Sequence, residues 1–331
     1  MKLVTFDADG APRLGAMTAD ENHVVDIQAA EVSINRRPYQ PFRSMLALIE
    51  GGPPALDKIR QTLAKAEAGG APLMAMDQVR LMAPIPHPPQ MRDAMCFEKH
   101  LQQALEQAVL RQAADADDPP AAAAALRASG RFDIPKVWYQ QPIYYKANRF
   151  AVTGTGTDVV WPSYSKIMDY EMEFGIFIAK SGKDIPADQA RDYIFGYSVF
   201  NDFSARDAQM AEMAAQLGPA KGKDFDNANV IGPCIVTADE FGDPYDHDMI
   251  VRINGVEVSR GSSATMHWTF EDLIAHISQS ETLHAGEFIG SGTVGDGCGL
   301  EHGRSLKAGD VVELEVSGIG VLRNRVLRDD T

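Results

Sequence analysis

The sequence predicts an α+β fold in which strands predominate. Strand-like segments outnumber helical patterns in the larger, C-terminal part of the chain, and helices do not alternate regularly with strands. A Rossmann-type sheet is therefore disfavoured. Hydrophobic residues make up 45% and charged residues 23% of the 331 positions, which is ordinary globular composition with room for one large domain or two unequal ones.

Charge and cysteine content exclude several classes of protein. The formal net charge is −15, so nucleic acid is not an expected partner. No run of about 18 apolar residues suggests a membrane span, and Asp7 and Asp9 interrupt the start before a signal-peptide core develops. Cys96, Cys234 and Cys298 are too few and too far apart for a disulfide framework or a thiolate zinc site. We expect a cytoplasmic protein.

The N-terminal part begins with short strands and continues with helices. We expect strands at 3–6, 13–17 and 23–27, because apolar and β-branched residues there are separated by turn residues. Two helical patterns come next at 43–50 and 54–68, divided by a Gly-Gly-Pro-Pro sequence.

A proline-rich connector marks the predicted domain boundary. The segment APIPHPP at 83–89 carries four prolines and predicts a stiff, extended chain. We therefore expect a small N-terminal α+β domain at residues 1–82 and a main domain at residues 83–331.

The main domain opens with a helical excursion. Residues 98–116 repeat apolar side chains at helical spacing, and the alanines after Pro119 and Pro120 are able to start a second helix. We interpret about 104–135 as an insertion, either a lid over the site or a surface decoration.

Strands account for most of the remaining chain. We expect them within 137–161, at 169–179 and at 193–203, and as a pair joined by a glycine turn at 310–326.

Two helices carry capping-box patterns. Ser204 with Asp207 predicts a helix that begins near Ser204 and ends at Gly218, and Thr269 with Asp272 repeats the pattern further along the chain.

Acidic residues alternate at the start of one predicted strand. Asp169, Glu171 and Glu173 lie on the same side of a strand because side chains alternate between its faces. One interpretation is a solvated face. The apolar run FGIFI directly after them favours the other, in which buried carboxylates hold a hard cation such as Mg²⁺, Mn²⁺ or Ca²⁺.

Further polar residues gather at the next strand-to-helix junction. Asp202 is either another oxygen ligand or a helix cap, and Arg206 and Gln209 fall on the first helical turn, where anions bind. Lys223 comes after Gly222, which allows close approach to a ligand, although a solvated loop lysine is commoner. The glycine loop 290–297 lacks a P-loop signature and suggests either a carboxylate-binding turn or a plain hairpin.

The order of these motifs resembles the fumarylacetoacetate hydrolase family from about residue 84 to the end of the chain. The resemblance rests on DYEMEFGIFI, then NDFSARDAQ, then KGKDFD, and finally GSGT with the closing LKAGDVVELEVSGIGVLRNRV. It implies a mixed β-sandwich roll that holds a divalent metal, Mg²⁺ or alternatively Mn²⁺ or Ca²⁺, in a homodimer.

The resemblance also implies roles for individual residues. His100, seven residues after Asp93, matches the catalytic histidine. Arg206, Gln209 and Lys223 match residues that bind substrate and stabilise an oxyanion. Tyr145 and Thr293 match substrate contacts. The implied metal ligands are Asp93, Glu171, Glu173 and Asp202.

Two departures from the family pattern bear on chemistry. Many bacterial members carry a glutamate where this chain has Gln103, and in the hydrolases proper the glutamate that assists the histidine comes after the SGT loop, where Glu301 and Glu313 both stand. The insertion beside the site is the second departure, and it keeps the specific substrate open.

The resemblance implies a hydrolase that cleaves a carbon–carbon bond in a β-diketone such as an acylpyruvate, of the kind met in catabolism of aromatic compounds. In this mechanism His100 deprotonates water, and a metal-stabilised enolate leaves. The alternatives are decarboxylation, isomerisation or dehydration of a 2-oxo acid, which need the enolate but not the water. A binding protein with a vestigial site is disfavoured, since the site residues are all present.

Overall fold

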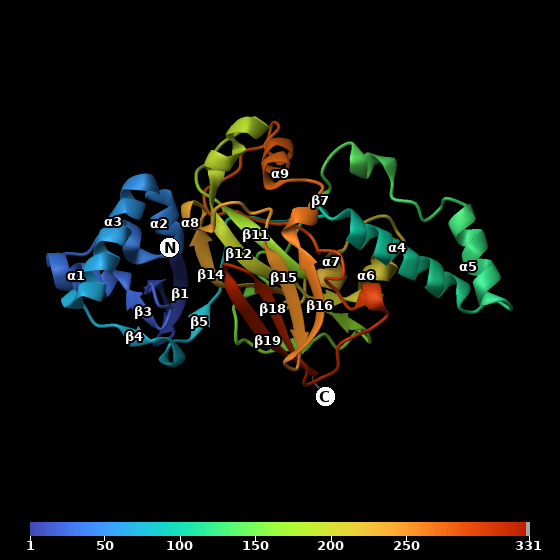
Figure 1. Cartoon of the computed structure of the whole chain (residues 1–331), viewed down its shortest axis with the longest axis horizontal. Coiled ribbons are helices and arrows are strands. Elements are labelled where there is room, and N and C mark those ends of the chain that lie inside the picture. The colour runs from blue at the N-terminus through green and yellow to red at the C-terminus, as the bar shows by residue number, and fades with distance from the viewer. Residues whose placement is uncertain (329–331) are drawn as a thin grey trace.

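The computed structural model describes residues 1–328. A large mixed sheet runs through the molecule in the order β4-β3-β2-β1-β14-β12-β11-β17-β6-β7, with β5 paired to β1 and β8 paired to β14. A second sheet has the order β16-β15-β18-β19-β9. The N-terminal helices lie at one end of the molecule and α4 and α5 at the other (Figure 1).

The N-terminal segment forms the expected strands and the two expected helices, and it adds a first helix that the sequence did not predict. β1 (Lys2–Ala8), β2 (Ala11–Met17) and β3 (His23–Asp26) make an antiparallel meander. The chain then forms α1 (Ile27–Asn35), α2 (Met45–Glu50) and α3 (Gly52–Lys65). β1 also pairs with β14 (Asn229–Thr237), so this segment shares a sheet with the rest of the chain. The division at residue 82 stays a prediction.

The centre of the large sheet is antiparallel and wholly buried. β12 (Ile194–Asp202) lies between β11 (Met172–Ile178) and β14, and every residue of the three strands is buried. This explains their continuous apolar runs, which alternation alone does not predict. The remaining elements of the two large sheets are β4 (Met74–Ala75), β5 (Leu81–Met82), β8 (Val152–Thr153), β9 (Val159–Trp161), β15 (Asp248–Ile253), β16 (Val256–Ser262), β18 (Val311–Val316) and β19 (Gly320–Arg328).

Two apolar cores lie on either side of the large sheet. One contains Phe174, Val251 and Leu314, which join β11 to the second sheet. The other contains Ile59 and Phe177, which join the N-terminal helices to the opposite face of the same strand. The strand that carries the acidic motif is therefore fixed from both faces.

The expected strand at 169–179 is interrupted. β10 (Met168–Asp169) pairs with β13 (Ser204–Ala205), and β11 begins only at Met172. The carboxylate of Asp169 accepts hydrogen bonds from the backbone N–H groups of Tyr170, at 2.9 Å, and Gly299, at 2.8 Å. The first of these bonds is local, and the second joins Asp169 to a segment 130 positions further along the chain.

The chain that follows the proline-rich segment 83–89 enters the large sheet as one strand of a parallel pair. β17 (Phe288–Gly290) pairs with β11 on one side and with β6 (Met91–Ala94) on the other. Asp93 on β6 stands opposite Gly290, and on its other side opposite Tyr145 of β7 (Tyr144–Lys146).

One of the two expected capping boxes is present. Thr269 and Asp272 form it at the start of α9 (Phe270–Ile277). The prediction for Ser204 and Asp207 is wrong: Ser204 Oγ donates to the carbonyl of Asp202, and Asp207 accepts from Ser165 Oγ at 2.6 Å. The helix α6 (Arg206–Met213) is also shorter than expected, and the short helices α7 (Ala220–Lys223) and α8 (Ala238–Phe241) come after it.

The expected helical excursion consists of α4 (Glu98–Ala113) and α5 (Pro119–Ala128). The two helices extend away from the sheets and contact each other through Val109, Ala113 and Ala123 (Figure 1). Their identity as an insertion stays a prediction.

A buried ion pair fixes β6 against the start of β17. Arg92 and Glu287 are each only 2% exposed and bond to each other. Arg92→Met should lower the free energy of unfolding by about 3–5 kcal/mol, because it leaves a buried carboxylate unpaired. Arg325→Met, which breaks an exposed pair with Asp158, should cost about 0–1 kcal/mol. Urea denaturation measures both, and equal losses would contradict the structural role of Arg92.

Candidate active site

Three carboxyl groups from separate strands of the large sheet converge. Asp93 lies on β6, Glu173 on β11 and Asp202 at the end of β12. Each offers an oxygen within 4.8 Å of the others, and all three are buried. The sequence interpretation of an acidic face turned to solvent is thus excluded, since Asp169 and Glu171 are buried as well.

The electrostatics of this cluster favour a bound cation. Burial, with the charge of Asp202, raises the pKa of Asp93 to about 8. Burial also raises the pKa of Asp202 to about 6 and, with the neighbouring Asp93, the pKa of Glu173 well above its usual value. A divalent cation offsets both causes, because its charge favours the ionised form of each carboxyl group.

Asp202 also has an oxygen without a partner. Its Oδ1 is buried and has no hydrogen bond among the residues that the structure describes. A buried carboxylate oxygen of this kind costs free energy unless an ion or water meets it. An all-carboxylate donor set suits hard cations such as Mg²⁺, Mn²⁺ or Ca²⁺. The residues present therefore fit the metal that the sequence suggests.

Glu171 is held differently from the other three predicted ligands. Its carboxylate bonds to Lys223 and lies 2.7 Å from Arg206 Nη1. Burial opposes its ionisation, but Arg206 and Lys223 outweigh burial and lower the pKa of Glu171. The structure therefore places Glu171 beside the close group of three carboxylates, and its role as a ligand stays a prediction.

Lys223 connects Glu171 to the close group of three carboxylates through Asp202. Its Nζ lies 2.6 Å from Asp202 Oδ2 and also bonds to Glu171. Burial disfavours the charged amine, yet Asp202 and Glu171 raise the pKa of Lys223 above its usual value. A Cβ on Gly222 would stand 2.7 Å from Gln209 Cα, so glycine permits the close contact of α7 with α6. The alternative of a solvated lysine is wrong.

Arg206 is fixed on three sides. Its Nε donates to Asp169 Oδ2 at 2.9 Å and its Nη1 to Gln209 Oε1 at 3.0 Å, in addition to the contact with Glu171. Arg206 and Gln209 thus lie together beside the carboxylates. The sequence identified Asp169 as acidic but not as the residue that orients Arg206; its place two residues before Glu171 was the available signal.

Tyr145 and the glycine loop complete the surroundings of the carboxylates. Tyr145 Oη donates to Asp202 Oδ2 at 2.8 Å. The backbone N–H of Gly292 donates to Glu173 Oε2 at 3.0 Å and to Asp93 Oδ1 at 3.2 Å. Thr293 Oγ1 lies 3.4 Å from Glu173 Oε1. The loop therefore binds the protein's own carboxylates, and the substrate contacts predicted for Tyr145 and Thr293 stay predictions.

The structure identifies the glutamate that contacts His100. Nδ1 of His100 lies 2.8 Å from Glu301 Oε1, and Glu301 Oε2 accepts from the N–H of Cys298 at 2.9 Å. Glu313 instead pairs with Arg323 on the second sheet. Position after the glycine loop was the only signal for Glu301, and it did not distinguish Glu301 from Glu313.

Gln103 has a structural partner of its own. Its amide donates to Asp296 Oδ1 at 2.6 Å, and its carbonyl accepts from the Asp296 N–H at 3.0 Å. These bonds attach α4 to the glycine loop. Gln103 therefore positions the helix that carries His100, while Glu301 meets the imidazole.

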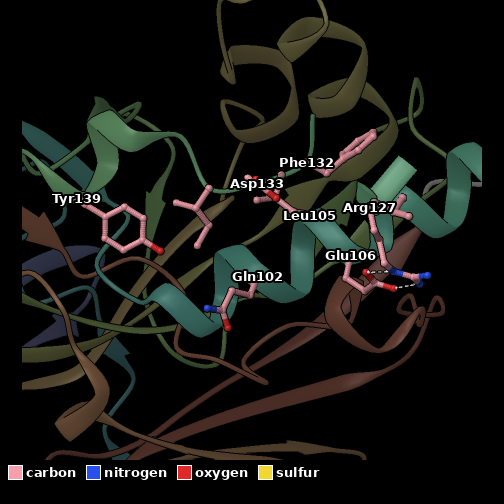
Figure 2. A pocket seen from close by; sticks show the side chains of 9 residues that line it. Gln102, Leu105, Glu106, Arg127, Phe132, Asp133 and Tyr139 are labelled. Atoms are coloured by element: carbon pink, nitrogen blue, oxygen red, sulfur yellow. Dashed lines mark hydrogen bonds and ion pairs between the residues drawn. The ribbon is translucent and has the colours of Figure 1, made fainter. Parts of the chain in front are cut away.

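A separate hollow lies on the other face of α4. It has a volume of about 400 Å³ and lies between α4, α5 and the segment that ends at Tyr139 (Figure 2). Leu105 and Val109 of α4 line it, and the ion pair of Glu106 with Arg127 lies at its side. The hollow contains none of the acidic residues of the cluster.

The fold and the acidic cluster define a known family of enzymes: the chain belongs to the fumarylacetoacetate hydrolase family. The family model for the fumarylacetoacetate (FAA) hydrolase C-terminal domain matches residues 111–327. The human oxaloacetate tautomerase FAHD2A, mitochondrial, is 29% identical over 331 residues, which cover 99% of this chain and 92% of that protein. Oxaloacetate tautomerase fahd2, mitochondrial, of Xenopus laevis is 30% identical over 99% of this chain and 90% of its own length.

Solved structures confirm the predicted fold class. A fumarylacetoacetate hydrolase from Exiguobacterium antarcticum is 26% identical with a TM-score of 0.70, covering 99% of this chain and 100% of that one. A maleylpyruvate hydrolase from Sphingobium sp. SYK-6, solved with manganese (II) and pyruvate, shares the fold with a TM-score of 0.71 at 21% identity, with both chains covered completely. Among residues 1–328, no helix has the length and apolar character needed to span a membrane.

Metal binding should strengthen as the pH rises. In the absence of metal, the raised pKa values of Asp93 and Asp202 mean that the folded state favours the neutral form of these two carboxyl groups. Their contribution to stability is present below the ordinary pKa of about 4 and is lost as the pH rises through about 6 for Asp202 and about 8 for Asp93. Mg²⁺ needs the ionised groups. At a hundredfold excess over Kd, a bound ligand stabilises the folded state by about 2.7 kcal/mol. The increase in Tm that Mg²⁺ produces should therefore be larger near pH 8 than near pH 5.

The variant Glu173→Gln should lose most of this metal-dependent increase, and the surface variant Asp158→Asn should keep it. Differential scanning fluorimetry with and without chelator measures the shifts. An increase of Tm that is the same at both pH values, or that survives in Glu173→Gln, would contradict a metal site at this cluster.

Proposed function

We propose that this protein is a divalent-metal-dependent hydrolase that cleaves a carbon–carbon bond in a β-diketone of the acylpyruvate type. The observation that carries the proposal is the contact of His100 with Glu301, which comes directly after the loop that binds the carboxylate cluster. A carboxylate that accepts from Nδ1–H leaves the lone pair on Nε2, which is the form needed in a general base.

The metal in this proposal is held by Asp93, Glu173 and Asp202, with Glu171 as a further ligand. Mg²⁺ is the first candidate and Mn²⁺ or Ca²⁺ the alternatives. When bound, such an ion supplies Lewis-acid stabilisation of an enolate oxygen. The raised carboxyl pKa values and the unpartnered oxygen of Asp202 support this assignment.

The chain's own residues account for the remaining steps. His100 takes a proton from water, and Glu301 holds the imidazole in orientation and stabilises its charged form. The hydroxide adds to the distal carbonyl carbon. Lys223 and Arg206, with the amide of Gln209, supply positive charge and donors for the oxyanion. The carbon–carbon bond then breaks, and the products are a carboxylate and an enolate that is protonated to the ketone.

A second candidate is tautomerisation or another isomerisation of a 2-oxo acid. Its support is the activity of the relatives, which are oxaloacetate tautomerases that cover 99% of this chain. Tautomerisation moves a proton between carbon and oxygen and consumes no water. His100 is equally able to accept that proton, so the two reactions share a base and differ in the nucleophile. Decarboxylation and dehydration remain variants of this second candidate.

The small-molecule partner in either case is a diketo or oxo acid. Assembly as a homodimer, a cytoplasmic location and a place in the catabolism of aromatic compounds are parts of the proposal that rest on the family resemblance.

Removal of the base should separate chemistry from binding. His100→Ala should lower kcat on an acylpyruvate roughly 10²–10⁴-fold, the usual effect of losing a general base, and should barely change KM, because Lys223, Arg206 and the metal hold the substrate. Glu301→Gln should lower kcat in the same direction, and the control Glu313→Gln should stay near wild type. Steady-state kinetics with acetylpyruvate measures all three.

Isotope incorporation should distinguish the two candidate reactions. Hydrolysis in labelled water places one heavy oxygen atom in the new carboxylate, after correction for carbonyl exchange, whereas a tautomerase incorporates solvent hydrogen at carbon and forms no new carboxylate. Wild-type turnover by His100→Ala would contradict the assignment of the base. Turnover of oxaloacetate enol without cleavage of any acylpyruvate would replace the hydrolase by the second candidate.

A further inference from the structure

A second group of metal-ligand side chains lies beside the base and is distinct from the three close carboxylates. His100, Cys298 and Glu301 each offer a ligand atom, and these atoms all lie within 4.8 Å of one another. His100 stands in the first turn of α4, Cys298 comes directly after the glycine loop, and Glu301 lies in the short 3₁₀ helix Leu300–His302. The group combines one nitrogen, one sulfur and one oxygen donor, whereas the carboxylate cluster offers oxygen alone.

The backbone around these donors is fixed from several directions. The N–H of Cys298 donates to Glu301 Oε2 at 2.9 Å, and Nδ1 of His100 lies 2.8 Å from Glu301 Oε1. Gln107 Nε2 donates to the Glu301 carbonyl at 3.2 Å, which ties α4 to the same segment. Cys298 also forms an isolated antiparallel bridge with Glu171. The donors are therefore held close together before any ion arrives, which lowers the entropic cost of binding one.

The thiol of Cys298 has no polar partner in the fold. Cys298 is fully buried, and within residues 1–328 its thiol forms no disulfide and no hydrogen bond. The buried thiol of Cys234, in contrast, donates to the carbonyl oxygen of Ile319 at 3.6 Å. Burial, and after it the charge of Asp169, raises the pKa of the Cys298 thiol. The thiol therefore keeps its proton until a cation offsets both causes, as a coordinated metal does.

The donor set suits zinc better than the hard cations expected at the carboxylates. Zn²⁺ binds Cys, His and Glu side chains in tetrahedral sites with bonds of about 2.0–2.3 Å, which place ligand atoms roughly 3.3–3.8 Å apart. This spacing lies between the 2.8 Å that separates Nδ1 of His100 from Oε1 of Glu301 and the 4.8 Å limit of the whole group. Mg²⁺ and Ca²⁺ take oxygen donors. The cysteines are too far apart in sequence for an all-thiolate site, but a mixed site needs only one thiolate.

We propose that His100, Cys298 and Glu301 form a zinc site separate from the carboxylate cluster, and that an ion bound there inhibits the enzyme by capturing its base. Binding releases the thiol proton to solvent and forms the bond between sulfur and zinc. The side chain of His100 is 12% exposed, which leaves an approach for the ion.

Either ring nitrogen of His100 gives the same inhibition, and this part of the inference rests on the proposed function. If zinc binds Nε2, it occupies the lone pair that accepts the proton from water. If it binds Nδ1, the ring proton moves to Nε2, and that lone pair is again lost. In both cases Glu301 bonds to the ion and no longer orients the imidazole. Binding of zinc itself does not depend on which reaction the enzyme catalyses.

Cobalt tests the binding directly, because Co²⁺ substitutes for Zn²⁺ and a bond from thiolate to Co²⁺ gives an intense near-ultraviolet absorption band. The protein is titrated with Co²⁺ while excess Mg²⁺ fills the carboxylate cluster. The wild type should develop the band, and added Zn²⁺ should remove it. Cys298→Ala should lack the band, whereas the control Cys234→Ala, which deletes another buried thiol, should keep it. His100→Ala should bind Zn²⁺ at least 10-fold more weakly in competition with a chromophoric chelator, which keeps the test decisive if Cys298→Ala does not fold.

Inhibition is measured on acetylpyruvate with Mg²⁺ present. Zn²⁺ should inhibit the wild type, and a large excess of Mg²⁺ should not relieve the inhibition. Cys298→Ala should raise the Zn²⁺ concentration for half-inhibition at least roughly 10- to 100-fold, since loss of even an outer partner of a metal has an effect of this size. Each variant is compared with its own activity in Mg²⁺ alone, and Cys234→Ala should match the wild type.

The two measurements separate this inference from the proposed function. If the wild type cleaves no acylpyruvate, the hydrolase proposal fails, and the cobalt spectrum still decides whether the site binds metal. A wild type without the thiolate band, a band that survives in Cys298→Ala, or unchanged zinc affinity in His100→Ala would overturn the zinc site. Zinc inhibition that excess Mg²⁺ relieves, or that is equal in the wild type and Cys298→Ala, would assign the inhibitory ion to the carboxylate cluster and overturn the captured base.

Discussion

The burial of acidic groups against an apolar sheet is the constraint on which the rest of the site depends. Five buried carboxyl groups, those of Asp93, Asp169, Glu171, Glu173 and Asp202, lie together, and the buried cations that pair with them within residues 1–328 are Lys223 and Arg206. The cations neutralise Glu171 and Asp169 directly, and Lys223 extends to Asp202. The excess of negative charge falls on Asp93 and Glu173, which have no cation of their own among residues 1–328. A divalent ion matches this excess in sign and position.

The glycine loop contacts the acidic cluster through a backbone N–H group. The N–H of Gly292 reaches both Asp93 and Glu173, and a Cβ at this position would stand 2.3 Å from the carbonyl oxygen of Ala94. Only glycine allows the loop to lie so close to β6. The same loop continues to Asp296, which binds Gln103, and to Glu301, which binds His100. A single segment thus connects the carboxylates to the base, and its position is set by the parallel pairing of β17 with β6.

Local sequence patterns predicted many of the helices and strands, whereas contacts between residues far apart in the sequence determine how the side chains of the candidate site are arranged. The strands at 3–6, 13–17 and 193–203 and the box at Thr269 depend on neighbours in sequence, and the structure contains them. The capping box predicted for Ser204 and Asp207 is absent, because the Asp207 carboxylate accepts hydrogen bonds from Ser165 and Lys166, about 40 positions away in the chain. The partner of His100 is 201 positions distant, and no local pattern distinguished Glu301 from Glu313. The motifs predicted residues that the structure brings together, but they did not reveal that Asp169 orients Arg206 or that Lys223 bridges Glu171 and Asp202.

The two faces of α4 have a consequence for how such an enzyme diverges. One face carries His100 and is tied by Gln103 to the glycine loop and by Gln107 to Glu301, whereas Val109 and Ala113 of the outer turns pack against Ala123 of α5. Changes in length or composition beyond Gln107 therefore leave the contacts of His100 in place while they alter the hollow between α4 and α5. In this architecture, evolution is free to exchange the outer turns of α4 together with α5 as a unit, with His100 and its partner Glu301 inherited unchanged.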